Sequence, residues 1–319
     1  MNNRRGYPGL LRLLIGAGIS VCVSLHAWAF DAQKAPFAVT LNERPIDSAI
    51  TFQPVMPAEA LVFRFTDQQS YTLIEGNVAF TAQAQRIHWQ APALPGHHTL
   101  RLQHTASQAQ IVVQVFVLVP ATQVVNGVLN GYKIGVYPPA LRGLNSYRAP
   151  EGYMEVAADM LDMQISPHFR LGQFLCKQES GFPKYVVLRP RLLQKLELLL
   201  QDLNGQGIAT DELAIMSGYR TPYYNRAIGN VSASRHLYGG AADVYVDVAP
   251  KDGQMDDLNG DGYVNVQDAM YLYERADRMV RHTGRADLTG GVGRYRSTAT
   301  HGPFVHVDVR GTRARWGLE

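Results

Sequence analysis

Residues 234–243, Ser-Arg-His-Leu-Tyr-Gly-Gly-Ala-Ala-Asp, place a histidine and a carboxylate seven positions apart across a run of small residues. A second histidine lies far downstream, in His306-Val307-Asp308. Catalytic zinc needs three nitrogen and oxygen ligands from the protein and a fourth position open to water, so we predict that His236, Asp243 and His306 bind Zn²⁺. The small residues predict a tight turn that leads into a strand over Ala242–Val248. The pattern indicates metal-assisted hydrolysis.

The spacing Ser-x-His-x-x-Gly-x-Ala-x-Asp, with a later His-x-Asp, resembles that of the bacterial zinc D-Ala-D-Ala carboxypeptidases and related peptidoglycan endopeptidases, whose fold is shared with the lysostaphin and hedgehog domains. Residues 217–222, Ser-Gly-Tyr-Arg-Thr-Pro, are also similar to this family, in which that arginine faces the carboxylate of the substrate. The resemblance spans roughly residues 125–319. It implies an α+β zinc peptidase domain that acts on peptidoglycan peptides, with Arg220 in the catalytic site. The alternative role for Arg220 is a surface or interdomain ion pair.

The general base of this family is not found at its usual place. Related enzymes carry Glu, Asp or His two or three residues before the last zinc ligand, where this chain has Pro303 and Phe304. The nearest candidates for the base are His301 and Asp308. Because side chains alternate along a strand, Asp308 shares a face with His306, and its alternative role is to orient a ligand histidine.

A second predicted metal site lies at residues 257–268, Asp-Leu-Asn-Gly-Asp-Gly-Tyr-Val-Asn-Val-Gln-Asp. Oxygen-bearing side chains alternate at its start and the glycine needed for the sharp turn is present, as in a calcium loop of EF-hand or dockerin type. The predicted Ca²⁺ ligands are Asp257, Asn259, Asp261, Asn265 and Asp268, with Tyr263 through its backbone carbonyl. The last position is Asp where an EF-hand has Glu. The alternative is a solvated acidic turn. A structural ion here would order an insertion near residues 252–268.

Residues 1–29 have the features of a cleaved signal peptide. Three arginines precede or open the apolar run 10–25, and Ala27-Trp28-Ala29 fits a cleavage site. The run is short for a membrane span, so we expect a periplasmic or secreted protein with no stable membrane span. The segment holds three of the 30 Lys and Arg and none of the 27 Asp and Glu, so the mature chain is neutral. No nucleic-acid partner is therefore indicated.

The mature chain is long enough for two domains. Residues 30–120 contain short alternating or apolar runs, at 61–65, 86–89, 99–102 and 110–119, which predict an all-β sandwich. Residues 89–96 resemble a strand and turn of immunoglobulin-like bacterial surface modules. We expect this part to bind the wall or a partner, or to serve as a spacer.

The rest of the chain divides into two further parts. Residues 121–165 are predicted to form an ordered connector, and residues 166–319 the zinc peptidase domain. In that domain Pro190 opens a leucine-rich helix that ends at Asn204-Gly205. Cys176, the lone cysteine of the mature chain, is predicted to be buried.

Two functions follow from these features. The first is an exported zinc peptidase that cleaves peptidoglycan stem peptides or crosslinks, as an endopeptidase or a D,D-carboxypeptidase. The second, suggested by the missing base, is a non-catalytic, calcium-dependent wall-binding protein with a structural zinc site. The sequence indicates neither an oligomeric state nor a partner protein.

Overall fold

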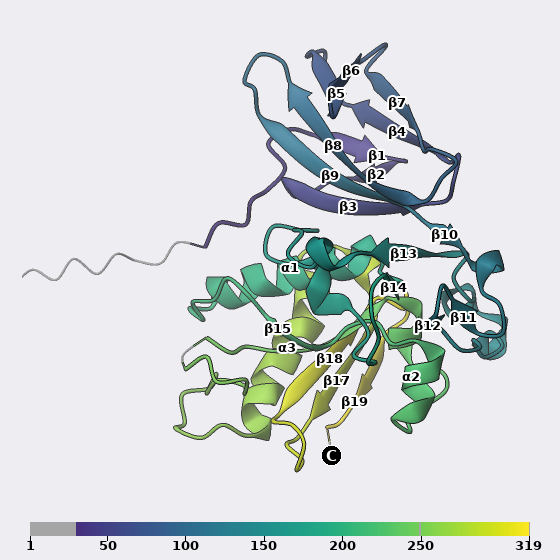
Figure 1. Ribbon diagram of the computed structural model, residues 1–319. Helices are drawn as coiled ribbons and strands as arrows, with labels where there is room; N and C mark the ends of the chain where they lie inside the picture. Colours follow the sequence, from purple (N-terminus) through teal and green to yellow (C-terminus); the bar gives the residue numbers. More distant parts are fainter. Residues whose placement is uncertain (1–29, 249, 319) are drawn as a thin grey trace, which may run out of the picture.

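The computed structural model describes residues 30–248 and 250–318. The predicted signal peptide, residues 1–29, lies outside the described residues. Within the described ranges, no helix has the length and apolar character needed to cross a membrane. Figure 1 shows a β-rich part, drawn in purple and blue, above a mixed part of helices and strands that holds the C-terminus. The chain is therefore a mixed α+β protein.

The N-terminal part contains two sheets that enclose one apolar core. Their strand orders are β2-β1-β4-β7 and β3-β9-β8-β5-β6. The strands are β1 (Val39–Leu41), β2 (Arg44–Pro45), β3 (Ile50–Val55), β4 (Ala60–Phe65), β5 (Tyr71–Glu75), β6 (Val78–Thr81), β7 (Arg86–Gln90), β8 (Gly96–His104) and β9 (Gln110–Val117). In β4, alternate residues are buried, as expected for a strand with one face on a core. These side chains share the core with residues of β8 and β9 from the opposite sheet, such as Leu100 and Val113.

The segment after β9 ties the two parts together. Its strands are β10 (Val119–Pro120), β11 (Val128–Leu129), β12 (Tyr132–Lys133), β13 (Gly152–Val156) and β14 (Lys184–Val186). β13 pairs with β10 on one side and with β14 on the other, so the predicted connector is hydrogen-bonded to the segments before and after it. The buried tyrosines Tyr132, Tyr153 and Tyr185 form a small core of their own here.

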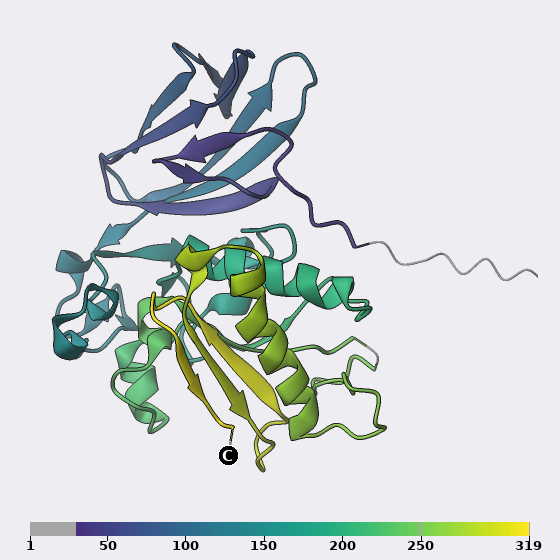
Figure 2. The same cartoon turned by 180° about the vertical axis from the view of Figure 1, so that it is seen from behind.

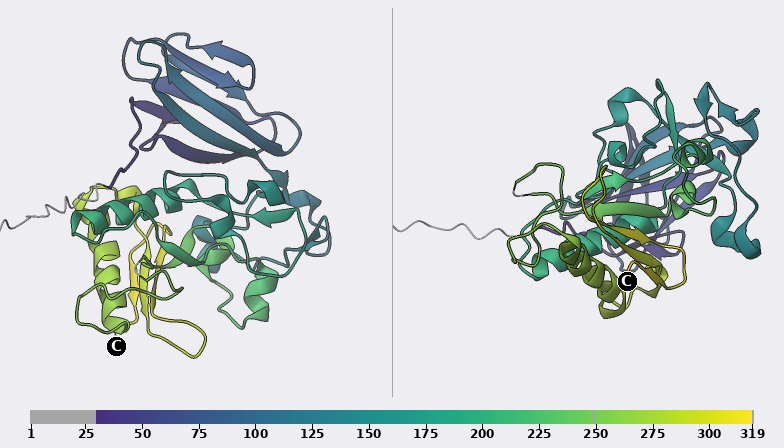
Figure 3. Two further views of the ribbon diagram at one scale, coloured as in Figure 1. Left: turned by 60° about the vertical axis from the view of Figure 1, so that its left-hand side comes forward. Right: turned by 90° about the horizontal axis from the view of Figure 1, so that it is seen from below.

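The C-terminal part is built on a five-stranded sheet with the order β15-β16-β18-β17-β19. Its strands are β15 (Ala214–Ser217), β16 (Ala241–Tyr245), β17 (Gly291–Tyr295), β18 (Phe304–Asp308) and β19 (Ala314–Trp316), and its helices are α1 (Pro190–Gly205), α2 (Pro222–Ala227) and α3 (Val266–His282). α3 packs on β17 and β18 and also against α1, and Figures 2 and 3 show it beside the yellow strands. The face of the sheet that does not contact α3 carries the side chains that line a cavity.

Several sequence predictions can be compared with these elements. The leucine-rich helix that opens at Pro190 is confirmed, and its leucines are buried in the main core. Cys176 is confirmed as buried. The strand predicted over 242–248 is wrong at its end, because β16 stops at Tyr245 and the chain then turns toward an Asp256 carboxylate that accepts a hydrogen bond from Val248 N at 2.9 Å.

Candidate active site

One row of residues crosses all five strands of the C-terminal sheet. Strand pairing aligns Ser217 with Asp243, Asp243 with His306, His306 with Gly293, and Gly293 with Trp316. Residues that are directly opposite each other in neighbouring strands project to the same face of a sheet. The register therefore places the predicted ligands Asp243 and His306 side by side.

The third predicted ligand, His236, reaches this row from a short 3-10 helix, η6 (Arg235–Tyr238). The helix ends at Gly239 in the left-handed conformation, with φ 63°. A Cβ atom at Gly239 would lie 2.2 Å from Val187 O, so only glycine fits this turn. A hydrogen bond fixes the orientation of the imidazole: His236 Nδ1 lies 2.6 Å from the carbonyl oxygen of Gly218. That contact leaves His236 Nε2 free to face the sheet.

The three predicted ligands meet with separations suited to one metal ion. His306 Nδ1 lies 2.9 Å from Asp243 Oδ1, and His236 Nε2 lies 3.2 Å from both of these atoms. Nitrogen and oxygen ligands placed about 2.0–2.2 Å from a tetrahedral zinc are separated by roughly 3.4 Å. Among the described residues, these three side chains form the group of His, Cys, Asp or Glu residues that could hold a metal ion, because their ligand atoms all lie within 4.8 Å of one another. The residues present therefore fit a zinc ion.

Hydrogen bonds fix which ring nitrogen of each histidine is available to a metal. His236 Nδ1 donates to Gly218 O, and His306 Nε2 lies 3.2 Å from Asp308 Oδ2, so the opposite nitrogens are the ligands. Burial lowers the pKa of His236 more than the neighbouring Asp243 raises it, which favours the neutral ring that a metal requires. Burial alone would raise the pKa of Asp243, but the charges and hydrogen bonds of both histidines outweigh it and hold that pKa well below its usual range.

Asp308, a candidate for the general base, is fully buried behind His306. Its carboxylate also accepts hydrogen bonds from Gly291 N at 2.8 Å and from the Arg310 side chain at 2.5–3.0 Å. Burial would raise the pKa of Asp308, but the hydrogen bonds from His306 and Arg310 lower it, so the group is ionised. Asp308 is not among the residues that line the cavity in front of the triad. This position matches its second predicted role, which is to orient His306.

Arg220, predicted to bind a substrate carboxylate, contacts a metal ligand in the described structure. Its Nη2 lies 2.6 Å from Asp243 Oδ2, and its Nε donates to Ser217 Oγ at 2.8 Å. The guanidinium thus holds the oxygen of Asp243 that does not face the two histidines. This ion pair is buried within the C-terminal sheet, so it is not the surface or interdomain pair expected as the alternative. Binding of a substrate carboxylate by Arg220 stays a prediction.

His301, the other candidate base, lies in the loop between β17 and β18. Its ring is 5.0 Å from that of Phe304 and its Nδ1 is 2.8 Å from Gly302 O. The structure does not place His301 among the residues that line the cavity at the triad.

A cavity of about 410 Å³ opens in front of the triad. Besides the ligands and Arg220, its wall contains aromatic and basic residues that sequence reasoning missed: Tyr147, Arg235, Tyr295, Phe304, Arg310 and Trp316. Three arginines, Arg220, Arg235 and Arg310, therefore line the cavity, and Asp243 is the acidic residue in its lining.

Arg235 stacks over Tyr147 at 4.3 Å, and two of its buried nitrogens have no hydrogen-bond partner. The sequence contained one signal for this wall, which is Gly293. A glycine inside a strand often marks a place where another group approaches the backbone closely. In the structure that group is Trp316, because a Cβ at Gly293 would lie 2.1 Å from its ring.

The predicted calcium loop has a different geometry. Asp257 accepts hydrogen bonds from Gly260 N at 2.8 Å and Gly262 N at 2.7 Å. Asp268 is buried, accepts from Leu258 N at 2.8 Å, and caps the start of α3 through Asn265 N at 2.8 Å. Among the described residues, the loop carboxylates form no group of three or more whose ligand atoms all lie within 4.8 Å of one another. Calcium binding by this loop stays a prediction.

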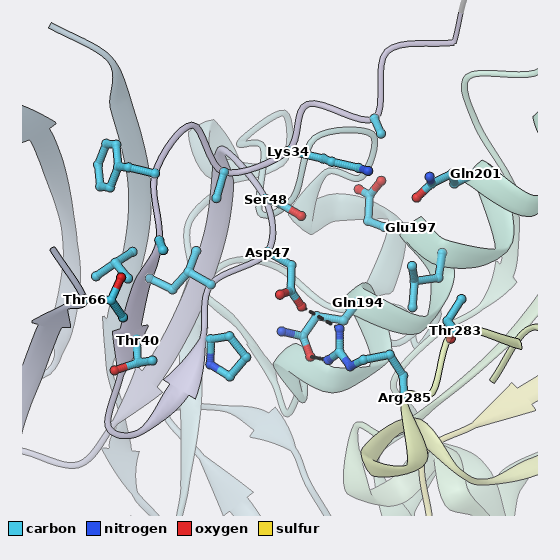
Figure 4. Close-up of a pocket in the computed structure, with 18 residues that line it drawn as sticks. Lys34, Thr40, Asp47, Ser48, Thr66, Gln194, Glu197, Gln201, Thr283 and Arg285 are labelled. Atoms are coloured by element: carbon cyan, nitrogen blue, oxygen red, sulfur yellow. Dashed lines mark hydrogen bonds and ion pairs between the residues drawn. The ribbon is translucent and has the colours of Figure 1, made fainter. Parts of the chain in front are cut away.

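A larger cavity, of about 690 Å³, lies between the N-terminal sheets and α1. Figure 4 shows that polar side chains from both parts meet there, with Arg285 Nη1 at 2.5 Å from Asp47 Oδ2 and Arg285 Nη2 at 3.2 Å from Gln194 Oε1. Its lining includes none of the triad residues. The cavity belongs to the contact between the two parts of the chain.

Comparison with known proteins gives one family match. Residues 167–257 match the family model described as Peptidase M15. The matched segment includes the Ser217–Arg220 stretch, His236 and Asp243, and it covers less than a third of the chain. No curated protein and no solved structure matches the chain. The match supports a zinc metallopeptidase in general terms.

Proposed function

We propose that this protein is an exported zinc peptidase that hydrolyses peptide bonds in peptidoglycan stem peptides or crosslinks. The observation that carries the proposal is the triad His236, Asp243 and His306, whose ligand atoms converge at the wall of an open cavity. Zinc held by these residues would lower the pKa of a water in the open position and polarise the scissile carbonyl. The Peptidase M15 match supports the same chemistry from the sequence.

The alternative, a non-catalytic wall-binding protein with a structural zinc, fits the site less well. Structural zinc sites are closed by four protein ligands, whereas catalytic sites keep one position open. Here three ligands face a cavity of about 410 Å³. The open position favours hydrolysis.

The charge of the cavity supports an anionic peptide substrate. Arg220, Arg235 and Arg310 line the wall, and two of them already have carboxylate partners in Asp243 and Asp308. Arg235 has no carboxylate partner among the described residues. Stem peptides carry free carboxylates, and a planar guanidinium recognises a carboxylate through two parallel hydrogen bonds.

Hydrolysis of purified peptidoglycan tests the proposal. The chelator-treated protein is titrated with Zn²⁺ and incubated with crosslinked muropeptides, and the products are identified by mass. Loss of a terminal D-alanine identifies a carboxypeptidase, and conversion of crosslinked dimers to monomers identifies an endopeptidase. If the zinc-loaded protein binds muropeptides but releases no product, the wall-binding alternative is correct.

A further inference from the structure

Tyr295 is the last residue of β17 and faces the cavity at the triad. It pairs with Phe304 across the strands, while Gly293, two residues earlier, pairs with His306. Because side chains alternate along a strand, Tyr295 lies on the face that carries His306. Its ring stacks on that of Phe304, with centroids 4.5 Å apart and an interplanar angle of 5°. The ring is therefore fixed in direction.

The position of the Tyr295 hydroxyl follows from Trp316. Trp316 lies over Gly293, since a Cβ at that glycine would be 2.2 Å from Trp316 Nε1. The same nitrogen donates a hydrogen bond to Tyr295 Oη at 2.9 Å. The hydroxyl therefore lies close to the Trp316 and Gly293 end of the row that contains Asp243 and His306, on the wall of the same cavity. The Trp316 ring also lies 5.2 Å from the His306 ring, centroid to centroid, so one indole contacts both the Tyr295 hydroxyl and a predicted metal ligand.

The hydroxyl proton of Tyr295 is available to a ligand in the cavity. An indole N–H only donates, so the bond from Trp316 uses Tyr295 Oη as an acceptor and leaves its own O–H to donate. Among the described residues, no acceptor takes that proton. Burial raises the pKa of Tyr295, and the hydrogen bond from Trp316 works in the opposite direction to a smaller extent. The group therefore stays protonated at neutral pH and is a donor, not a base.

We propose that Tyr295 is a catalytic residue that donates a hydrogen bond to the scissile carbonyl oxygen as negative charge develops on it. This inference rests on the proposed peptidase function. In the reaction, water adds to the carbonyl carbon, the C–N bond breaks, and the amine leaves with a proton that derives from the water. Tyr295 keeps its own proton throughout. A donor aimed at developing charge is already in place before reaction and stabilises the transition state more than the bound substrate.

The variant Tyr295→Phe tests this role, because it keeps the ring that stacks on Phe304 and removes only the hydroxyl. Loss of one such donor is expected to lower kcat about 100- to 1000-fold, with KM and zinc content unchanged. Tyr245→Phe is the matched control, since the Tyr245 hydroxyl belongs to the same sheet but donates to Gly253 O at 3.1 Å, outside the cavity lining. A kcat within twofold of the unaltered protein, or a change confined to KM, would overturn the inference.

A binding measurement separates this inference from the proposed function. A phosphinate analogue of D-alanyl-D-alanine mimics the charged transition state, and D-alanine is a product. Calorimetry with both zinc-loaded proteins should show about 100-fold weaker binding of the phosphinate to Tyr295→Phe and equal binding of D-alanine. Equal phosphinate binding by the two proteins contradicts the role of Tyr295. Absence of hydrolysis by the unaltered protein contradicts the proposed function, whereas hydrolysis combined with equal phosphinate binding contradicts the role of Tyr295 alone.

Discussion

The triad and the loop at residues 257–268 are two predicted metal sites that differ in what holds their carboxylates. Asp243 is paired in a sheet, and its two oxygens contact histidine nitrogens and the Arg220 guanidinium. Asp257 and Asp268 in the loop accept hydrogen bonds from backbone N–H groups of the loop itself. The first site needs distant segments to fold together, and the second is formed by neighbouring residues.

This difference shows how far a motif predicts a geometry. The triad draws on η6, β16 and β18, so its convergence depends on sheet register and on the turn at Gly239. Ligand atoms brought together in that way point to a metal, because burying a carboxylate between two imidazoles is costly unless the charges are compensated. Loop carboxylates that bond their own backbone are stable with or without an ion. Experiments that remove a metal should therefore affect the two regions to different degrees.

The largest effect is expected for His306→Ala. Loss of one of three ligands should abolish stoichiometric zinc binding and reduce hydrolysis to background. Zinc content is measured by elemental analysis of the purified protein, and His88→Ala, which alters an exposed histidine of β7, is the matched control. Full zinc occupancy in His306→Ala would show that the ligand assignment is wrong.

A smaller effect is expected for Asp308→Asn, which weakens the hydrogen bond to His306 Nε2. Loss of a partner that orients a metal-binding histidine typically lowers metal affinity about 10- to 100-fold. Competition with a zinc chelator measures the affinity, and kcat is measured at saturating zinc. A normal affinity combined with a strongly reduced kcat would instead assign Asp308 as the general base.

The sequence predicted the site more fully than its surroundings. The spacing of His236, Asp243 and His306 identified residues whose ligand atoms converge in the structure. The period-two pattern also placed Asp308 on the same face as His306, where they form a hydrogen bond. Both inferences depend on local rules, namely strand alternation and the tight turn allowed by glycine.

The cavity wall was not predicted because it depends on contacts between remote segments. Tyr147 comes from the connector and Trp316 from the last strand, and no sequence spacing relates them to the triad. The contact of Arg220 with Asp243 was not predicted either: the register of β15 on β16 places Ser217 beside that carboxylate. The substrate role of Arg220 stays a prediction. Sheet register is set by the whole fold and cannot be read from one strand.

Arg220→Lys should reduce catalysis while leaving most of the zinc bound. Lysine keeps the positive charge near Asp243 but loses the planar fork that contacts both Asp243 Oδ2 and Ser217 Oγ. We expect kcat/KM on wall peptides to fall about tenfold and zinc content to change much less. Substrates with an amidated C-terminus provide the control: if they lose the same factor as the free acids, Arg220 acts on the site geometry and not on a substrate carboxylate.

The smallest effect is expected for calcium at residues 257–268, and it should appear in stability before activity. Calcium that binds only the folded loop stabilises the protein by about 1.4 kcal/mol when its free concentration is roughly ten times the Kd, which corresponds to a rise in Tm of about 3–6 °C for a domain of this size. Asp261→Ala should erase this rise, because Asp261 is predicted to supply a ligand. Asp252→Ala, in the same exposed segment but before the loop, should keep this rise in Tm.

Melting curves that test this prediction are recorded at fixed zinc, with calcium and with a calcium-selective chelator. Identical curves for the unaltered protein would mean that the hydrogen bonds from the backbone already satisfy Asp257 and Asp268, and that the loop is a solvated acidic turn. A calcium-dependent rise would instead show that an exposed loop can retain a metal site without the buried, convergent ligands that define the triad.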